Sequence, residues 1–230
     1  MSRRGESPQR ERSGSGALPD YYPFVAEDIL RLCNPEDDGV VVDIGSGEGP
    51  VALALAERCR AHMILVDPSD DALASARESA VQKGCGDRIR TMRGRAEELP
   101  LADGSVDLIF SRGSIYFWDD QPRGIAEAYR VLREGGKAMI GGGLGRDYPR
   151  WARQEFIRRR HEGARSKGRE AYERFLRLRD PATFEQWARE AGLPDFDVVG
   201  EGGMPAENPQ AGLGIWLRFD KREREHERSY

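Results

Sequence analysis

The stretch from Val40 to Pro50 places the tightest constraint on how this chain can fold. It reads VVVDIGSGEGP: a run of β-branched residues, an acidic residue, and then three glycines that alternate with other residues. An unbroken β-branched run favours a strand that is buried on both faces of a parallel sheet. The alternating glycines predict a turn whose bare backbone approaches a ligand at the start of a helix.

The spacing of these glycines separates two classes of nucleotide ligand. A dinucleotide-binding turn has the pattern G-x-G-x-x-G, whose third glycine lets the helix pack closely on the strand. Here Pro50 occupies that position, and the third glycine, Gly49, comes one residue earlier. The resulting pattern, D-x-G-x-G-x-G, resembles motif I of the class I S-adenosylmethionine-dependent methyltransferases. The resemblance implies S-adenosyl-L-methionine as the cofactor and S-adenosyl-L-homocysteine as its product.

The same resemblance implies roles for the residues of the turn. In this family the backbone of the turn approaches the methionine part of the cofactor, which here means Gly45, Ser46, Gly47 and Gly49. The acidic residue at the end of the strand lies near the cofactor amino group, and that residue is Asp43.

A second acidic residue, Asp67, ends the next apolar run and is followed by Pro68. A carboxylate at this place can accept two hydrogen bonds from the hydroxyls of a ribose. NAD-dependent enzymes use the same arrangement, so Asp67 indicates an adenosine-containing cofactor rather than one family. The alternative is that Asp67 only caps the following helix, a role for which Ser69 is better placed.

The segment GRAEELP at residues 94–100 resembles the family's G-D-A-x-x-L-P segment, which frames the adenine. Arg95 stands where the family has an aspartate, and arginine cannot accept a hydrogen bond from the adenine amino group. Ala96 can still offer its backbone N–H to the ring. We therefore expect Ala96 at the adenine and consider Glu97 as a replacement carboxylate.

Two later segments also match the family and complete the order of its motifs. Residues 103–114 resemble the fourth-strand segment, and residues 129–137 resemble the R-V-L-x-x-G-G turn, in which Gly135 is predicted to end a helix. Together the resemblances run from Val40 to Gly143.

The segment at residues 111–119 lies where the family brings the methyl donor and acceptor together. Ser111 and Arg112 are predicted beside the cofactor, and ordinary packing of the aromatic residues is an equally weighted alternative. The catalytic group is unassigned, with Tyr116 and His161 as candidates, although a surface histidine without a role is the simpler interpretation of His161. The predicted substrate pocket consists of Tyr22, Arg112, Ser114, Tyr116 and Trp118.

Strands and helices alternate along most of the chain, which predicts an α/β fold with a doubly wound, mostly parallel, seven-stranded sheet and a helical insertion after the fifth strand. We expect a single domain at 18–220, with the insertion or lid at about 147–180, a disordered tail at 1–17 and a charged tail at 221–230. Strands are expected at 40–44, 63–66, 89–93, 106–110, 137–140, 196–199 and 213–219.

Composition excludes several classes of function. The net charge of −4 over 230 residues disfavours nucleic acid as a partner, and the arginines of the predicted insertion are interleaved with glutamates. Three scattered cysteines indicate neither disulfides nor a metal site. No apolar run approaches the roughly 18 residues of a membrane span. We therefore predict a cytoplasmic protein without a membrane partner, and a homodimer is left open.

These features together predict an enzyme that transfers a methyl group from S-adenosyl-L-methionine to a small-molecule acceptor. The alternatives are a non-catalytic S-adenosylmethionine-binding regulator or partner subunit, an RNA or DNA methyltransferase and an NAD-dependent dehydrogenase. Methyl transfer needs orientation and desolvation more than a dedicated catalytic group. For this reason the lack of a catalytic triad does not argue against an enzyme.

Overall fold

The computed structural model describes residues 17–206 and 214–222. The disordered tail predicted at 1–17 and the charged tail predicted at 221–230 therefore lie almost wholly outside the described residues.

A single seven-stranded sheet forms the centre of the fold, in the order β3-β2-β1-β4-β5-β7-β6. The first five strands are parallel, and β7 runs antiparallel to both β5 and β6. The strand order reverses between β1 and β4, which makes their carboxyl ends the expected place for a ligand. The strands are β1 Val40–Ile44, β2 His62–Asp67, β3 Ile89–Arg93, β4 Val106–Arg112, β5 Leu132–Gly142, β6 Asp197–Val199 and β7 Ile215–Asp220.

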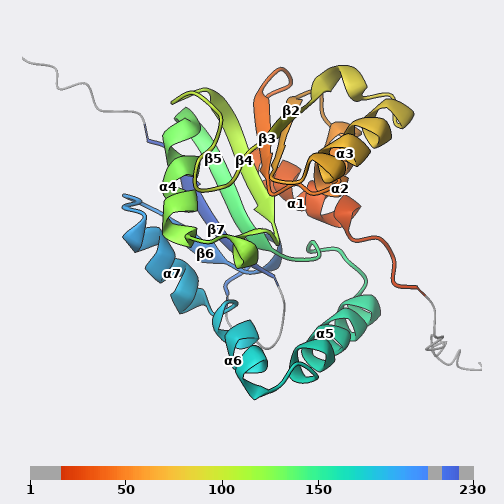
Figure 1. Cartoon of the computed structure of the whole chain (residues 1–230), viewed down its shortest axis with the longest axis vertical. Helices are drawn as coiled ribbons and strands as arrows, with labels where there is room; N and C mark the ends of the chain where they lie inside the picture. Colours follow the sequence, from red (N-terminus) through yellow and green to blue (C-terminus); the bar gives the residue numbers. More distant parts are fainter. Residues whose placement is uncertain (1–16, 207–213, 223–230) are drawn as a thin grey trace, which may run out of the picture.

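Helices cover both faces of this sheet, as Figure 1 shows, with α1, α2 and α3 on one face and α4 and α7 on the other. Successive side chains of a strand point to opposite faces, so Val41 joins one core cluster and Val42 the other. The helices are α1 Tyr22–Cys33, α2 Pro50–Ala56, α3 Asp70–Gln82, α4 Gln121–Val131, α5 Arg150–Arg165, α6 Arg169–Arg177 and α7 Pro181–Glu190, with short 3₁₀ helices η1 Gly86–Arg88, η2 Ile115–Phe117 and η3 Glu201–Gly203. The doubly wound fold predicted from the sequence is confirmed.

Helices α5 and α6 follow β5 and stand apart from the two helical layers (Figure 1). Some of their surface arginines are paired with glutamates one helical turn away: Arg158 bonds Glu155 and Glu162, and Arg169 bonds Glu173. Such exposed pairs contribute little to stability individually but neutralise the basic surface. The buried Glu201 connects this region to the sheet, because it accepts hydrogen bonds from the backbone after β5 and from Arg153.

The predicted end of the helix before the fifth strand is wrong. Gly135 was expected to end the helix before the fifth strand, but α4 already ends at Val131 and β5 begins at Leu132. Gly135 lies inside β5 with a positive φ of 75°, and its N–H donates to the carbonyl of Lys221. Leu132 pairs with Val106 across an irregularity in the register, so pairing with distant strands extends this segment.

Among the helices of the described residues, none has the combination of length and apolar character that crossing a membrane requires.

Candidate functional site

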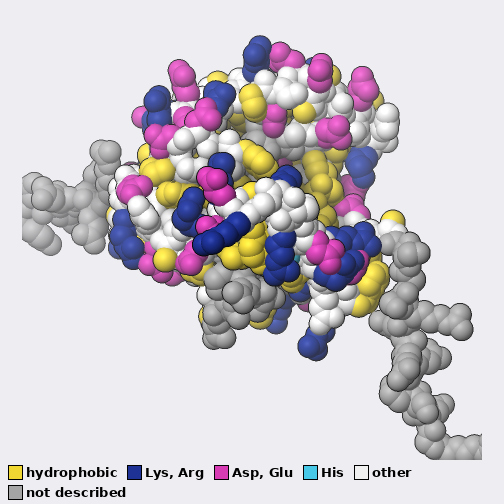
Figure 2. Space-filling model, turned by 60° about the horizontal axis from the view of Figure 1, so that its bottom comes forward, with side chains coloured by type: hydrophobic (Ala, Val, Ile, Leu, Met, Phe, Trp, Pro, Cys, Tyr) yellow, Lys and Arg dark blue, Asp and Glu magenta, His cyan; other side chains and the backbone are white. Residues whose placement is uncertain are grey.

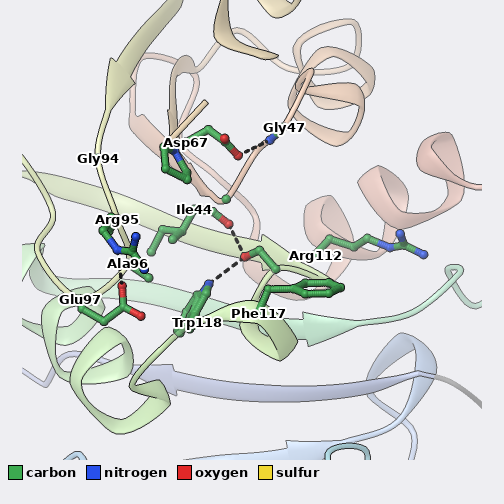
Figure 3. A pocket seen from close by; sticks show the side chains of 14 residues that line it. Ile44, Gly47, Asp67, Gly94, Arg95, Ala96, Glu97, Arg112, Phe117 and Trp118 are labelled. Atoms are coloured by element: carbon green, nitrogen blue, oxygen red, sulfur yellow. Dashed lines mark hydrogen bonds and ion pairs between the residues drawn. The ribbon is translucent and has the colours of Figure 1, made fainter. Parts of the chain in front are cut away.

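A cleft of about 370 Å³ opens at the carboxyl ends of β1, β2 and β4, at the point where the strand order reverses. We call it the strand-end cleft. Figure 3 shows its walls: the glycine turn and Asp67 on one side, and Arg95, Glu97 and Trp118 on the other. It is lined by Ile44, Gly45, Gly47, Asp67, Pro68, Gly94, Arg95, Ala96, Glu97, Arg112, Gly113, Ser114, Phe117 and Trp118.

The glycine turn exposes its backbone to the cleft because each glycine adopts a positive φ, 67° at Gly45 and 55° at Gly47. A Cβ on Gly45 would collide with Ser114, whereas a Cβ on Gly47 would meet no atom within 4 Å. Gly45 is therefore required by close packing, and Gly47 leaves open space for a ligand. Gly49 faces the other way: a Cβ there would collide with the side chain of Leu65 on β2.

The carboxylate of Asp67 links the glycine turn to the residues that precede α3. Its Oδ2 accepts a hydrogen bond from the N–H of Gly47 at 2.8 Å, and its Oδ1 accepts one from Ser69 at 2.9 Å. A carboxylate has about four acceptor positions, so two remain for ligand hydroxyls. The capping alternative does not account for Asp67, because Ser69 caps α3 through the N–H of Ala72.

Asp43 lies beneath the turn, with only 4% of its surface exposed. Burial raises the pKa of Asp43 well above its ordinary range, and the nearby charge of Asp67 raises it further. Two acidic side chains close together in a buried place favour a positively charged group between or beside them. Asp43 and Ser46 do not line the cleft directly but support its floor.

The residues predicted to frame the adenine form hydrogen bonds and ion pairs with one another and with the start of α4. Glu97 Oε1 accepts hydrogen bonds from the N–H groups of Asp119 and Asp120, at 2.7 and 3.2 Å. Arg95 forms ion pairs with Asp119 and with Glu97. Ala96 lines the cleft between them, while the carboxylate of Glu97 already anchors the turn before α4.

Ser114 is the centre of a hydrogen-bond network under the cleft (Figure 3). Its Oγ donates to the carbonyl of Ile44 at 2.7 Å and accepts from the indole Nε1 of Trp118 at 3.0 Å. Its Oγ also lies 2.5 Å from the hydroxyl of Ser111, which is fully buried. Ser111 and Ser114 thus hold β1, β4 and η2 together at the floor of the cleft.

Arg112 ends β4 and borders both this cleft and a second, smaller cavity of about 90 Å³. Its Nε donates to the carbonyl of Gly143 at 3.0 Å, and its Nη1 donates to the hydroxyl of Tyr21 at 3.2 Å. The guanidinium lies 4.2 Å from the ring centre of Tyr21. We call the second cavity the arginine chamber; it is lined by Tyr21, Arg112, Gly113, Tyr116, Gly142, Gly143, Leu144, Phe156, Arg160 and Arg179.

The structure distributes the predicted substrate-pocket residues over both cavities. Ser114 and Trp118 line the strand-end cleft, and Tyr116 lines the arginine chamber. Tyr22 lines neither cavity; its neighbour Tyr21 takes that place, and the hydroxyls of the two tyrosines lie 3.3 Å apart. Burial, with the contact to Tyr21, raises the pKa of Tyr22 to about 12.

The two candidate catalytic groups lie in different surroundings. His161 contacts the hydroxyl of Tyr172 through Nδ1 at 2.9 Å and lines a hollow of α5 and α6 rather than the cavities around Arg112. Its pKa is lowered, mainly by burial and also by Arg165 and Arg179. Tyr116 borders the chamber, but burial raises its pKa, so it remains protonated and can donate a hydrogen bond.

Sequence reasoning missed several lining residues. Arg160 and Arg179 were not distinguished from the other arginines of the helical segment, and Tyr21 was passed over for Tyr22. Phe117, whose surface is 82% exposed, borders the strand-end cleft and a further hollow against α5 and α6. The exposure of a large aromatic residue at a cavity mouth is visible only in the folded structure.

Comparison with known proteins finds similarity to methyltransferases over part of the chain. Residues 42–140 match the methyltransferase domain family. The chain is 45% identical over 103 residues to 2-methyl-6-phytyl-1,4-hydroquinone methyltransferase 2, chloroplastic, from Oryza sativa subsp. japonica, covering 44% of this chain and 28% of that protein. It is 33% identical over 100 residues to a ubiquinone/menaquinone biosynthesis C-methyltransferase from Brucella anthropi, covering 43% and 38% respectively.

The match to a solved structure is more extensive. A crystal structure from Methanococcus maripaludis, assigned to the S-adenosyl-L-methionine-dependent methyltransferases, aligns with a TM-score of 0.69 and 29% identity, covering 90% of this chain and 87% of the other. By contrast, the chain spans less than two fifths of the length of the two curated relatives.

Proposed function

Because this chain carries a methyltransferase domain of the class I S-adenosylmethionine-dependent family, we propose that it transfers a methyl group from S-adenosyl-L-methionine to a small-molecule acceptor. The observation that carries the proposal is the strand-end cleft, in which an open glycine turn and the carboxylate of Asp67 face the same space. The cofactor supplies a methyl group already activated on a sulfonium, so the protein need not supply a nucleophile.

The residues of the cleft fit this cofactor. The free space above Gly47 admits a ligand against the backbone, and Asp67 presents acceptors for ribose hydroxyls. Pro68 and Ala96 provide apolar walls for a flat ring. The carboxylate of Asp67 beside the turn suits a donor that carries an ammonium group and a sulfonium.

The remaining residues would orient the acceptor and exclude water. Arg112 lies at the junction of the two cavities, where the donor and the acceptor would meet. Helices α5 and α6 border the chamber on the side away from the sheet and would act as a lid over the acceptor. Exclusion of water strengthens every electrostatic contact at the reacting centre.

The test is a titration with S-adenosyl-L-homocysteine by calorimetry, followed by an assay of S-adenosyl-L-homocysteine formation over a panel of acceptors. Hydroquinones belong in the panel because the plant and bacterial relatives are named for hydroquinone and ubiquinone/menaquinone methylation. Binding together with turnover supports the enzyme. Binding without turnover over a broad panel favours the regulatory alternative, and NAD binding without S-adenosyl-L-homocysteine binding contradicts both.

A cytoplasmic location and a homodimer are retained as proposals from the sequence. The plant relatives are named as chloroplastic, so location is a question for fractionation of the source cells. Sedimentation of the purified chain tests the dimer.

A further inference from the structure

The arginine chamber has an unusual charge balance. Three guanidinium groups, those of Arg112, Arg160 and Arg179, line a cavity of about 90 Å³, and no acidic side chain of the described residues lines it. Figure 2 shows dark blue side chains gathered around a yellow hollow at the end of the molecule that carries α5 and α6. Two neighbouring arginines of α5 differ, because Arg158 and Arg159 are paired with glutamates. The chamber thus gathers three cations without a carboxylate among the side chains that line it, and the nearby Glu201 is already paired with Arg153.

Of these three guanidinium groups, that of Arg179 is the most buried, so its charge destabilises the fold most. Only 9% of its surface is exposed, and its guanidinium lies between two aromatic rings, 4.0 Å from the centre of Tyr116 and 4.2 Å from that of Phe175. Its one hydrogen bond among the described residues goes to the carbonyl of Phe175, at 3.1 Å. A buried charge without a counter-charge is destabilising, and arginine cannot escape the cost by losing its proton.

The hydroxyl of Tyr116 adds a hydrogen-bond donor without a described partner to the wall of the arginine chamber. Its side chain is 8% exposed, and its buried hydroxyl has no hydrogen-bond partner in the described structure. A buried hydroxyl without a partner is destabilising and is rare in folded proteins. Burial raises the pKa of Tyr116, so the hydroxyl keeps its proton and acts as a donor at neutral pH. The buried guanidinium of Arg179, the more exposed ones of Arg112 and Arg160, and the phenol of Tyr116 line one small space and form a receptor for an oxyanion.

We propose that the methyl acceptor carries an oxyanion, a carboxylate or a phosphate ester, which binds in the arginine chamber to Arg160, Arg179 and the hydroxyl of Tyr116. This inference rests on the proposed methyl-transfer function and names the chemical class of its substrate.

The chamber belongs to the acceptor rather than to the cofactor. S-adenosyl-L-methionine has a carboxylate of its own, and Arg112, which borders both cavities, is placed to serve it. Arg160 and Arg179 do not line the strand-end cleft; they line the chamber and the adjoining hollow of about 430 Å³ along α5 and α6. That hollow is lined by aromatic side chains, Phe117 and Phe175 among them, and by further cationic ones such as Lys167 and Arg174, and it offers room for the rest of the acceptor. The oxyanion would thus lie in the chamber, with the rest of the molecule against aromatic side chains.

The test measures binding of three matched probes, benzoate, phenyl phosphate and benzamide, to the full chain with S-adenosyl-L-homocysteine present. We expect one of the two anions to bind at least about tenfold more tightly than neutral benzamide, since charge-assisted hydrogen bonds are roughly twice as strong as neutral ones. Preference for benzoate identifies a carboxylate acceptor, and preference for phenyl phosphate identifies a phosphate ester. Equal binding of all three probes overturns the proposal.

Two arginine variants locate the anion. Arg179→Met and Arg160→Met keep much of the apolar stem, and each should lose the preference for the anion by about tenfold. Arg160 is exposed, so its variant remains informative if Arg179→Met does not fold. The matched control is Arg169→Met on α6, whose side chain is 91% exposed and paired with Glu173. An unchanged preference in both variants, or an equal loss in the control, contradicts the assignment.

The affinity for S-adenosyl-L-homocysteine separates this proposal from the methyl-transfer function. It should be unchanged in both arginine variants; a parallel loss would mean that the chamber holds the cofactor carboxylate, which overturns the acceptor assignment. If the unmodified chain does not bind S-adenosyl-L-homocysteine at all, the function itself fails, whatever the probes do.

Tyr116→Phe provides an independent readout. Removal of a buried hydroxyl that lacks a partner should raise the melting temperature of the free protein. The same change should weaken binding of the preferred anion by about threefold or more, since one donor is lost. A merely structural role would leave anion binding unchanged.

Discussion

The strand-end cleft and the arginine chamber share Arg112, yet they are built in different ways. In the cleft, Asp43 and Asp67 come from strands whose hydrogen bonds fix their positions, and the ligand would contact backbone as much as side chains. In the chamber, Arg160 and Arg179 extend from α5 and from the loop after α6. The cleft is thus built from the ends of the central strands, whereas the chamber also depends on α5 and the loop after α6.

The two cavities also differ in charge. Acidic and basic side chains both line the cleft, whereas every charged side chain that lines the chamber is an arginine, which suits an anionic acceptor. The following substitutions test whether the two regions can be separated.

The largest effect is expected from Gly45→Ala. The positive φ costs about 1–2 kcal/mol, and overpacking against Ser114 adds about 1–3 kcal/mol. We therefore expect the free energy of unfolding, measured with urea, to fall by about 2–5 kcal/mol. Gly47→Ala is the matched control: it carries the cost of the positive φ alone, because its Cβ would meet open space. Equal losses at both positions would show that Ser114 is free to move.

Asp67→Ala should weaken binding of S-adenosyl-L-homocysteine by about 1.5–3 kcal/mol, or roughly 10- to 100-fold, because it removes a charged acceptor. Calorimetry measures the effect. Asp70→Ala is the control, since Asp70 begins α3 with an exposed side chain paired to Arg93. An unchanged affinity in Asp67→Ala would remove this residue from the ribose site.

Asp43→Asn should stabilise the free protein at neutral pH. Burial raises the pKa of Asp43 in the folded state, so folding favours the protonated form, and this contribution is lost as the pH rises through the raised pKa. Asparagine removes the cost, and its advantage in melting temperature should vanish below the ordinary value of 3.8, where Asp43 is protonated in both states. Binding of the cofactor should weaken at the same time. A variant that is less stable at pH 7 would contradict this account.

The smallest effect is expected from Trp118→Phe. It removes the hydrogen bond from the indole to Ser114 and should lower the free energy of unfolding by about 0.5–1.5 kcal/mol, measured with urea. The anion preference of the chamber should be unchanged. A loss of that preference would show that the cleft floor and the chamber are mechanically coupled.

The accuracy of the sequence-based predictions also differs between the sheet and the arginine chamber. The strands at 40–44 and 89–93 were predicted with the bounds that the structure shows, because local apolar patterns determine them. The end of α4 was misplaced because Leu132 and Gly135 are held by Val106 and Lys221, which lie far away in the sequence. The doubly wound, mostly parallel sheet was accessible from the alternation of strands and helices, and the resemblance to methyltransferases from motifs whose residues are neighbours in the chain.

The residues of the arginine chamber could be predicted from the sequence much less well. Arg160 and Arg179 differ from Arg158 in what surrounds them, which depends on how α5 and α6 pack near Tyr116. A pattern of charges along a helix indicates which residues can pair, but it does not indicate which ones remain without a partner. Tyr21 and Tyr22 both lie near Arg112, and the start of α1 decides that the hydroxyl of Tyr21 accepts its hydrogen bond.

The position of Arg112 has a thermodynamic consequence. One guanidinium borders both cavities, so occupation of either changes the electrostatic potential in the other. Linkage requires this influence to be reciprocal: whatever factor the first ligand contributes to the affinity of the second, the second returns to the first. The cofactor and the acceptor would then bind cooperatively. The sign of this cooperativity must be the same whichever of the two is titrated first.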